Sequence, residues 1–299
     1  MTDPTAQAVP PAQPFQPLKG VRVLSLALNL PGPAALMRLA QMGADCLKLE
    51  PPGGDPMAQY SATAYARLHD GIQRLTADLK TEAGQQQLAR ELAHTDVLIT
   101  SFRPSALLKL GLNWPALHEK YPQLSQIAIV GAPGERAEEP GHDLTYQADN
   151  DLITGLTLPA TLYADMGGAL MASEAVLQAV LHQRSEGRGV CIEVALSSAA
   201  GFLALPRAWG VTQAGAAVGG GHAGYRVYPC QDGRVAMAAL EPHFALRLCA
   251  AAGIAMPHVQ TMFEAATHAA VAAFLLTQTR KQLDALAAEK DIPLHTLGH

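Results

Sequence analysis

Aromatic residues, basic runs and paired cysteines are all scarce in this sequence of 299 residues. Aromatic side chains make up only 5% of it, although 49% of the residues are hydrophobic. The core must therefore be built mainly from alanine, leucine and valine, which suit tightly packed helices and helix-covered parallel strands. The net charge is −5 and no long basic run is present, which argues against a nucleic-acid-binding protein.

The four cysteines are scattered, without a CxxC pair or the spacing of a zinc site: Cys46, Cys191, Cys230 and Cys249. This pattern predicts reduced core cysteines, and neither a disulfide framework nor a metal centre. The sequence also lacks an apolar run of the roughly 18 residues that a membrane span needs. Residues 1–17 have neither the basic start nor the apolar centre of a signal peptide. We therefore expect a cytoplasmic protein with a disordered leader at 1–17.

Apolar runs typical of buried strands alternate with helical patterns through the first half of the chain. Strands are predicted at "VRVLSLAL", "ADCLKLEPP", "RLTADLK", "DVLITSF" and "LSQIAIVG". Helices are predicted at "GPAALMRLAQMG" and "TEAGQQQLARELAHT", and a longer one at "GGALMASEAVLQAVLHQRSEGRG". Such alternation predicts an α/β domain with an open, mostly parallel sheet.

The pattern changes after three consecutive glycines at 219–221. The stretch "YRVYPCQDGRVAMAAL" predicts two strands joined by a tight turn at "QDG", and an Ala-rich helical region spans 258–290. We therefore expect a large domain at 18–210 and a smaller α+β domain at 211–299.

Open parallel sheets bind ligands beyond the carboxyl ends of their strands. Three predicted loops lie there: "NLPGP", "EPPGGDP" and "SFRP". The glycines of the second loop permit close approach of a ligand, but a plain turn has the same composition. Arg38, Arg74 and Arg103 can supply positive charge at this edge, although solvated surface arginines would give the same pattern.

Three short motifs place acidic residues at predicted element boundaries. His142 and Asp143 stand side by side in "PGHDLTY", and Asp165 precedes the glycine pair of "YADMGGAL". Glu241 in "ALEPHF" follows an apolar strand and precedes a proline. A helix N-terminus stabilises an ionised carboxylate, and glycines beside Asp165 would let a substrate approach the backbone. Simple helix capping explains the same acids, so the residues alone leave capping and acid–base catalysis open.

Several collinear stretches over residues 17–298 resemble the CaiB/BaiF superfamily, the family III CoA transferases and α-methylacyl-CoA racemases. They include "LKGVRVLSLALNLPGPAALMRLAQMGADCLKLEPPGGDP", "PGHDLTY", "ADMGGAL" and "YPCQDGRVAMAALEPHF". The resemblance implies a Rossmann-like large domain, a smaller domain without the usual return segment, and an interlocked homodimer. Its ligand would be an acyl-CoA thioester, with coenzyme A as part of the substrate and no permanently bound cofactor or metal.

The resemblance also implies roles for individual residues. In the racemase branch His142 and Asp165 are the two bases, Glu241 hydrogen-bonds the histidine, and Asp143 and Tyr146 support them. In the transferase branch the residue matched by Asp165 attacks the thioester and carries the acyl group as a mixed anhydride. Candidate contacts to coenzyme A are Arg38, Arg74, Arg103, Pro51 and Gly53.

The combination of "PGHDLTY" with "ALEPHF" favours the racemase branch, because acyl transfer does not need the histidine. Removing a proton next to a thioester and returning it from the opposite face requires two bases. We therefore expect racemisation or epimerisation of a 2-methylacyl-CoA. A family III CoA transferase and a catalytically silent CoA-binding or interaction homologue stay open as alternatives.

Overall fold

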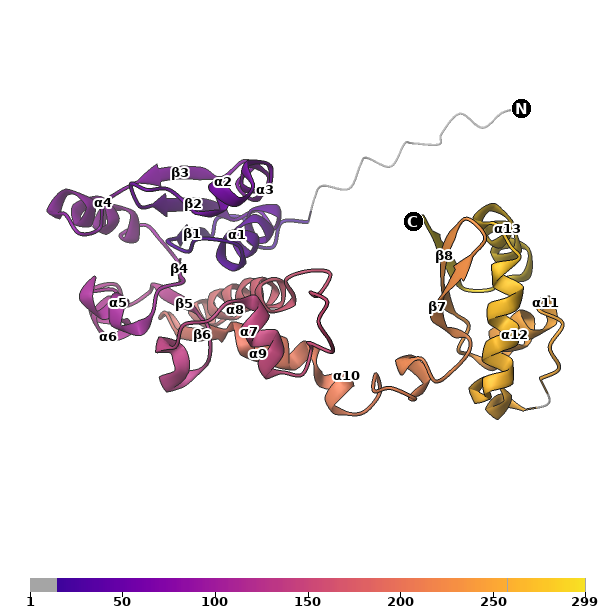
Figure 1. Ribbon diagram of the computed structural model, residues 1–299. Coiled ribbons are helices and arrows are strands. Elements are labelled where there is room, and N and C mark those ends of the chain that lie inside the picture. The colour runs from indigo at the N-terminus through magenta and orange to yellow at the C-terminus, as the bar shows by residue number, and fades with distance from the viewer. Residues whose placement is uncertain (1–14, 257, 299) are drawn as a thin grey trace, which may run out of the picture. The chain divides into compact units, whose positions relative to one another are not determined.

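Residues 15–256 and 258–298 are described by the structure, which is a computed structural model. They form two compact units that divide between Leu203 and Ala204 (Figure 1), whereas the sequence placed this boundary after residue 210. Most of the leader predicted at 1–17 lies outside the described residues. No helix within 15–256 or 258–298 combines the length and apolar character needed to cross a membrane.

The first unit is built on a six-stranded sheet in which neighbouring strands are parallel. The spatial order is β3–β2–β1–β4–β5–β6, which confirms the predicted α/β architecture. The strands are β1 (Arg22–Ser25), β2 (Asp45–Glu50), β3 (Gln73–Thr76), β4 (Val97–Thr100), β5 (Ser125–Val130) and β6 (Cys191–Ala195). The order reverses between β1 and β4, and this switch point is where open α/β sheets bind their ligands.

Helices cover both faces of this sheet. Alternate residues of each strand point to opposite sides, so one strand contributes to both of the layers. Val97 and Ile99 of β4 pack with α1 (Pro31–Gln41) and α8 (Tyr163–Glu186). Leu98 belongs to the other layer, with α4 (Glu82–Leu92), α5 (Pro104–Lys109) and α6 (Trp114–Lys120). All four residues of β4 are buried, as expected for a central strand covered on both faces.

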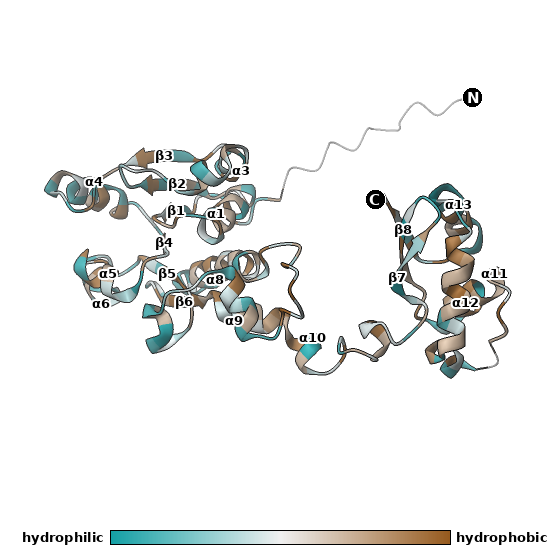
Figure 2. Ribbon diagram, viewed as in Figure 1, coloured by the Kyte–Doolittle hydropathy of each residue, from teal (hydrophilic) through white to brown (hydrophobic). Residues whose placement is uncertain are grey.

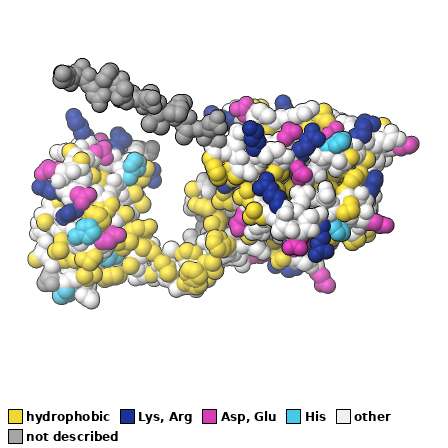
Figure 3. Space-filling model, turned by 180° about the vertical axis from the view of Figure 1, so that it is seen from behind, with side chains coloured by type: hydrophobic (Ala, Val, Ile, Leu, Met, Phe, Trp, Pro, Cys, Tyr) yellow, Lys and Arg dark blue, Asp and Glu magenta, His cyan; other side chains and the backbone are white. Residues whose placement is uncertain are grey.

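Shorter elements of the first unit lie near the ends of the strands. They are α2 (Met57–Tyr60), α3 (Ala62–Leu68), α7 (Asp143–Asp149) and α9 (Leu196–Leu203), together with a 3-10 turn, η1 (Gly134–Glu138). Acidic and basic side chains are interspersed over the face of this unit that Figure 3 shows, and no large basic patch gathers on that face.

The second unit contains a three-stranded antiparallel sheet of β7 (Tyr225–Cys230), β8 (Gly233–Ala238) and β9 (Leu294–Leu297). The predicted hairpin forms β7 and β8, whereas β9 was not predicted. Its helices are α10 (Leu205–Ala208), α11 (Pro242–Ala251), α12 (Ala265–Leu276) and α13 (Arg280–Lys290). Figure 2 shows α12 as largely apolar, and its Val271 and Leu275 lie in the core of this unit.

Candidate active site

A cleft of about 580 Å³ opens at the switch point of the parallel sheet. Its lining includes residues 28–31 after β1, 101–103 after β4, 129–131 at the end of β5, and 141–144 at the start of α7. Asp165, in the first turn of α8, also lines it. The volume is within the range of small-molecule sites, and the position is the one that the topology predicts.

The "HD" motif forms the start of α7. His142 occupies the N-cap position, where its backbone N–H donates to Thr145 Oγ1 at 3.1 Å. Asp143 is the first residue of the helix and is buried, so it is not the cap that the sequence also allowed. His142 is exposed on the cleft, and both residues line it.

The Asp143 carboxylate joins the starts of two helices. Its Oδ1 accepts the backbone N–H of Asp165 at 3.0 Å, and its Oδ2 accepts the side-chain amide of Gln147. Burial of Asp165 and, second, the negative charge of Asp143 raise the Asp165 pKa from 3.8 to about 6, and His142 opposes this rise. Asp165 is therefore ionised at neutral pH and also able to take up a proton close to that pH, a property typical of catalytic carboxylates.

Tyr146 also lines the cleft. Its ring fits beside Gly131 and Gly141, because a Cβ on Gly131 would lie 2.2 Å from the Tyr146 hydroxyl oxygen. Burial and the charge of Asp165 raise the Tyr146 pKa, whereas Arg103 lowers it. The phenol is thus un-ionised at neutral pH and lies within electrostatic reach of both Asp165 and Arg103.

The glycine pair after Asp165 does not have the predicted role. Helix α8 begins at Tyr163, so Gly167 and Gly168 lie inside it and do not open it. A Cβ on Gly168 would lie 2.2 Å from Leu196 Cδ2, and one on Gly167 would lie 3.1 Å from a methyl group of Leu203. These glycines allow close packing of α8 against α9.

Two backbone N–H groups at the start of "DMGGA" already have hydrogen-bond acceptors. The Asp165 N–H donates to Asp143, and the Met166 N–H donates to the Leu162 carbonyl at 3.0 Å. These two N–H groups are therefore not free to stabilise an enolate oxygen.

Arg103 alone among the predicted coenzyme A contacts lines the cleft in the described part of the chain. It is the N-cap residue of α5 and is exposed. Arg38 instead lies two turns into α1, where its Nε donates to Ser173 Oγ of α8 at 3.1 Å. Arg74 of β3 stacks over the Tyr65 ring, with its guanidinium carbon 5.2 Å from the ring centre.

The loop containing Pro51 and Gly53 forms an exposed turn after β2, in which the Gly54 N–H donates to the Pro51 carbonyl at 2.8 Å. Their contact with coenzyme A stays a prediction. Glu241 is the N-cap residue of α11 in the second unit. Its predicted hydrogen bond to His142 also stays a prediction.

The sequence did not reveal the polar groups that hold the backbone of Leu28 and Asn29, which line the cleft after β1. Asn29 has a φ of +65°, a left-handed conformation, and its N–H donates to Asp55 Oδ1 at 2.9 Å. The neighbouring Leu28 N–H donates to Ser101 Oγ at 3.2 Å. The partners are 26 and 73 positions apart in the chain, so a local pattern could not have paired them.

The fold and the cleft together define an α/β protein with a cleft that contains His142 and Asp165 at the switch point of a parallel sheet. The sequence profile of CoA-transferase family III matches residues 18–298. The chain therefore belongs to CoA-transferase family III, as the resemblance to the CaiB/BaiF superfamily indicated.

Individual relatives agree with this assignment. The chain is 32% identical over 207 residues to a probable fatty acyl-CoA transferase of Mycobacterium tuberculosis, covering 63% of this chain and 52% of that protein. It is 34% identical over 210 residues to a succinyl-CoA–D-citramalate CoA-transferase of Chloroflexus aurantiacus, covering 64% of this chain and 52% of that protein. The chain thus spans about half the length of the curated relatives it matches.

Solved structures extend the similarity over nearly the whole chain. A crystal structure of a hypothetical protein of Mycobacterium tuberculosis aligns with a TM-score of 0.83 and 26% identity, covering 96% of this chain and 86% of that one. A CaiB/BaiF family protein of Brucella suis aligns with a TM-score of 0.82 and 25% identity, covering 95% and 85%.

Proposed function

We propose that the cleft binds an acyl-CoA thioester and that the Asp165 carboxylate reacts with it in a CoA-transfer reaction. The observation that carries this proposal is a carboxylate with a pKa raised to about 6, placed in a cleft at the switch point of the sheet. The relatives named above support the reaction class, since their names describe CoA transferases.

The first chemical step follows from the position of Asp165. A carboxylate oxygen attacks the carbonyl carbon of the thioester, and the C–S bond breaks as the CoA thiolate leaves with its electron pair. The product is a mixed anhydride between Asp165 and the acyl group. Burial weakens the solvation of the carboxylate, and the negative charge of Asp143 repels it, which makes it more reactive than an exposed aspartate.

The remaining cleft residues fit this ligand. Arg103 supplies a positive charge that can pair with a phosphate of coenzyme A. Apolar side chains suited to an acyl chain line the same space: Leu28, Leu30, Ile129, Val130, Leu144, Leu162 and Leu196. The homodimer and the cytoplasmic location expected from the sequence belong to this proposal as well.

Racemisation of a 2-methylacyl-CoA is the second candidate, and the presence of His142 in the same cleft favours it. Neutral His142 and ionised Asp165 would remove and return the α-proton from opposite faces. Incubation with a 2-methylacyl-CoA in heavy water separates the two reactions. Racemisation predicts α-deuterium uptake that loses one stereochemical direction in His142→Ala, because Asp165 remains as a base. Transfer predicts no uptake and turnover that survives this substitution.

Binding is tested by calorimetric titration of the chain with coenzyme A and with acetyl-CoA. The proposal predicts saturable binding of both, together with loss of thioester turnover in Asp165→Asn. Asp149→Asn is the matched control, because Asp149 is exposed and paired with Arg136 at 3.3 Å. Absence of binding at millimolar ligand would refute the proposed function.

A further inference from the structure

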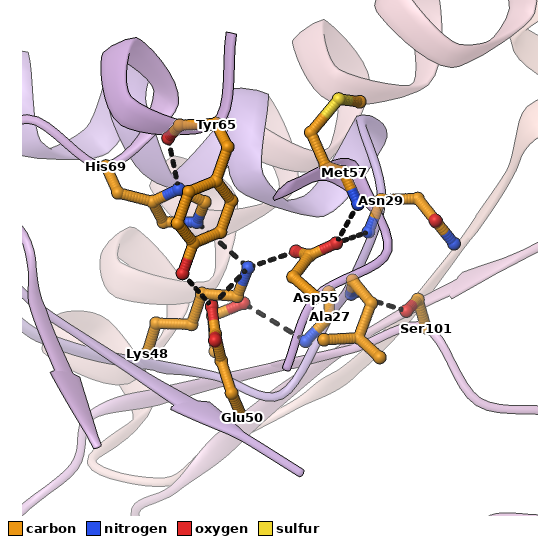
Figure 4. A network of polar contacts seen from close by, with 11 residues as sticks. Ala27, Asn29, Lys48, Glu50, Asp55, Met57, Tyr65, His69 and Ser101 are labelled. Atoms are coloured by element: carbon orange, nitrogen blue, oxygen red, sulfur yellow. Dashed lines mark hydrogen bonds and ion pairs between the residues drawn. The ribbon is translucent and has the colours of Figure 1, made fainter. Parts of the chain in front are cut away.

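A buried polar network centred on Lys48 lies beside the cleft (Figure 4). Lys48 is in β2 and its side chain is completely buried. Its ammonium contacts the Asp55 carboxylate, Glu50 Oε1 at 3.2 Å and His69 Nε2 at 2.9 Å. Asp55 and His69 are hydrogen-bond partners of the ammonium, and Glu50 forms an ion pair with it.

The second layer of contacts fixes the state of the histidine. Lysine can only donate, so His69 Nε2 accepts, and its Nδ1–H donates to the Tyr65 carbonyl at 2.7 Å. Burial lowers the His69 pKa, which agrees with a neutral ring. The Tyr65 hydroxyl in turn donates to Glu50 at 2.7 Å.

Glu50, Asp55 and His69 could in principle hold a metal ion, since their ligand atoms lie within 4.8 Å of one another. The Lys48 ammonium, however, already contacts all three. A divalent cation would have to displace a buried charge of the same sign. The Lys48 ammonium therefore takes the place that a metal ion would occupy at the centre of this network.

Asp55 connects the Lys48 network to two residues that line the cleft. Its Oδ2 contacts Lys48, and its Oδ1 accepts the backbone N–H groups of Asn29 and Met57, each at 2.9 Å. Asn29 and Met57 both line the cleft, on the loop after β1 and at the start of α2. Asn29 has a positive φ, a left-handed conformation that asparagine tolerates better than most residues, and the hydrogen bond from its N–H to Asp55 helps to fix it there.

We propose that Lys48 and Asp55 are positioning residues that hold the Asn29 and Met57 walls of the cleft in the conformation that accepts the CoA thioester. This inference rests on the proposed function. Lys48 provides the counter-charge for buried, ionised Asp55, and an ionised carboxylate accepts hydrogen bonds more strongly than a neutral group. The network thus links strand β2 to the backbone at Asn29 and Met57, which line the cleft.

The test uses the double variant Lys48→Met/Asp55→Asn, which removes both charges together. Lys48→Met alone leaves Asp55 buried without its partner, so we expect the double variant to be more stable than this single one. Backbone amides of Asn29 and Met57 should exchange with solvent faster, and the Kd for coenzyme A should rise, each by about tenfold. Lys19→Met, on the exposed turn before β1, is the control and should change neither value.

The outcomes separate positioning from plain stabilisation. Unchanged exchange at Asn29 and Met57, or an unchanged Kd in a folded double variant, would overturn the inference. Absence of coenzyme A binding by the wild-type chain would instead refute the proposed function, and amide exchange would still decide whether the network holds the two walls. If the double variant does not fold, Asp55→Asn alone gives the same readouts, because it leaves Lys48 its contacts with Glu50 and His69.

Discussion

Replacing Asp165 by asparagine is expected to stabilise the protein near neutral pH. The Asp165 pKa is raised from 3.8 to about 6 in the folded chain, so the folded state binds this proton more tightly than the unfolded state does. Stability is therefore lost as the pH rises from about 4 through about 6, and asparagine avoids this loss. A difference of about two pH units sets a ceiling of about 3 kcal/mol. Because the cleft is open to solvent, we expect an increase of about 1–2 kcal/mol.

Urea denaturation at pH 4 and at pH 7.5 measures this effect. The stability gain of Asp165→Asn over the wild type should be larger at pH 7.5 than at pH 4, where the wild-type carboxyl is protonated in the folded state. Asp149→Asn should change stability by less than about 1 kcal/mol at either pH, since it removes an exposed ion pair. An equal difference between wild type and Asp165→Asn at both pH values would refute the reasoning.

Three further substitutions test separate parts of the site. Asp143→Asn should lower the Asp165 pKa by less than about one unit, because burial is the larger cause of the raised pKa. An NMR titration that shows no decrease in the Asp165 pKa would contradict this expectation. Gly168→Ala should lower the free energy of unfolding in urea by about 1–3 kcal/mol, because the added Cβ meets Leu196. Gly155→Ala, where the added Cβ meets open space, should not lower it, and equal effects would contradict the packing role of Gly168. Arg103→Ala should weaken coenzyme A binding roughly tenfold by calorimetry, and an unchanged Kd would remove it from the phosphate site.

The parallel sheet was predictable because its central strands are short apolar runs bounded by loops. "DVLITSF" and "LSQIAIVG" contain β4 and β5, and their burial on both faces favours mostly apolar residues. Helices α2 and α3 gave no such signal, since α2 buries no residue and α3 buries only Leu68. Strand β9 is four residues long and pairs with β8 from about 60 positions away, so only tertiary contact defines it.

The site was predictable where a motif carried it, and not where distant partners define it. His142, Asp143, Tyr146 and Asp165 meet in one cleft, as the family resemblance implied. The Lys48 network was missed, because a lysine in "DCLKLE" is typical of a strand with one solvated face. Its partners Asp55 and His69 lie on two further segments, and only the fold shows that the side chain is buried among them.

The most direct test of the central claim is chemical trapping of an acyl group on Asp165. The chain is mixed with acetyl-CoA, quenched with hydroxylamine and digested, and the peptide containing residue 165 is analysed by mass spectrometry. Attack of hydroxylamine on the anhydride at the aspartyl carbonyl would leave a hydroxamate. The account predicts this modification at Asp165 in the wild type and in Asp149→Asn, dependent on the thioester and absent from Asp165→Asn. An unmodified Asp165 in a chain that consumes the thioester would contradict it.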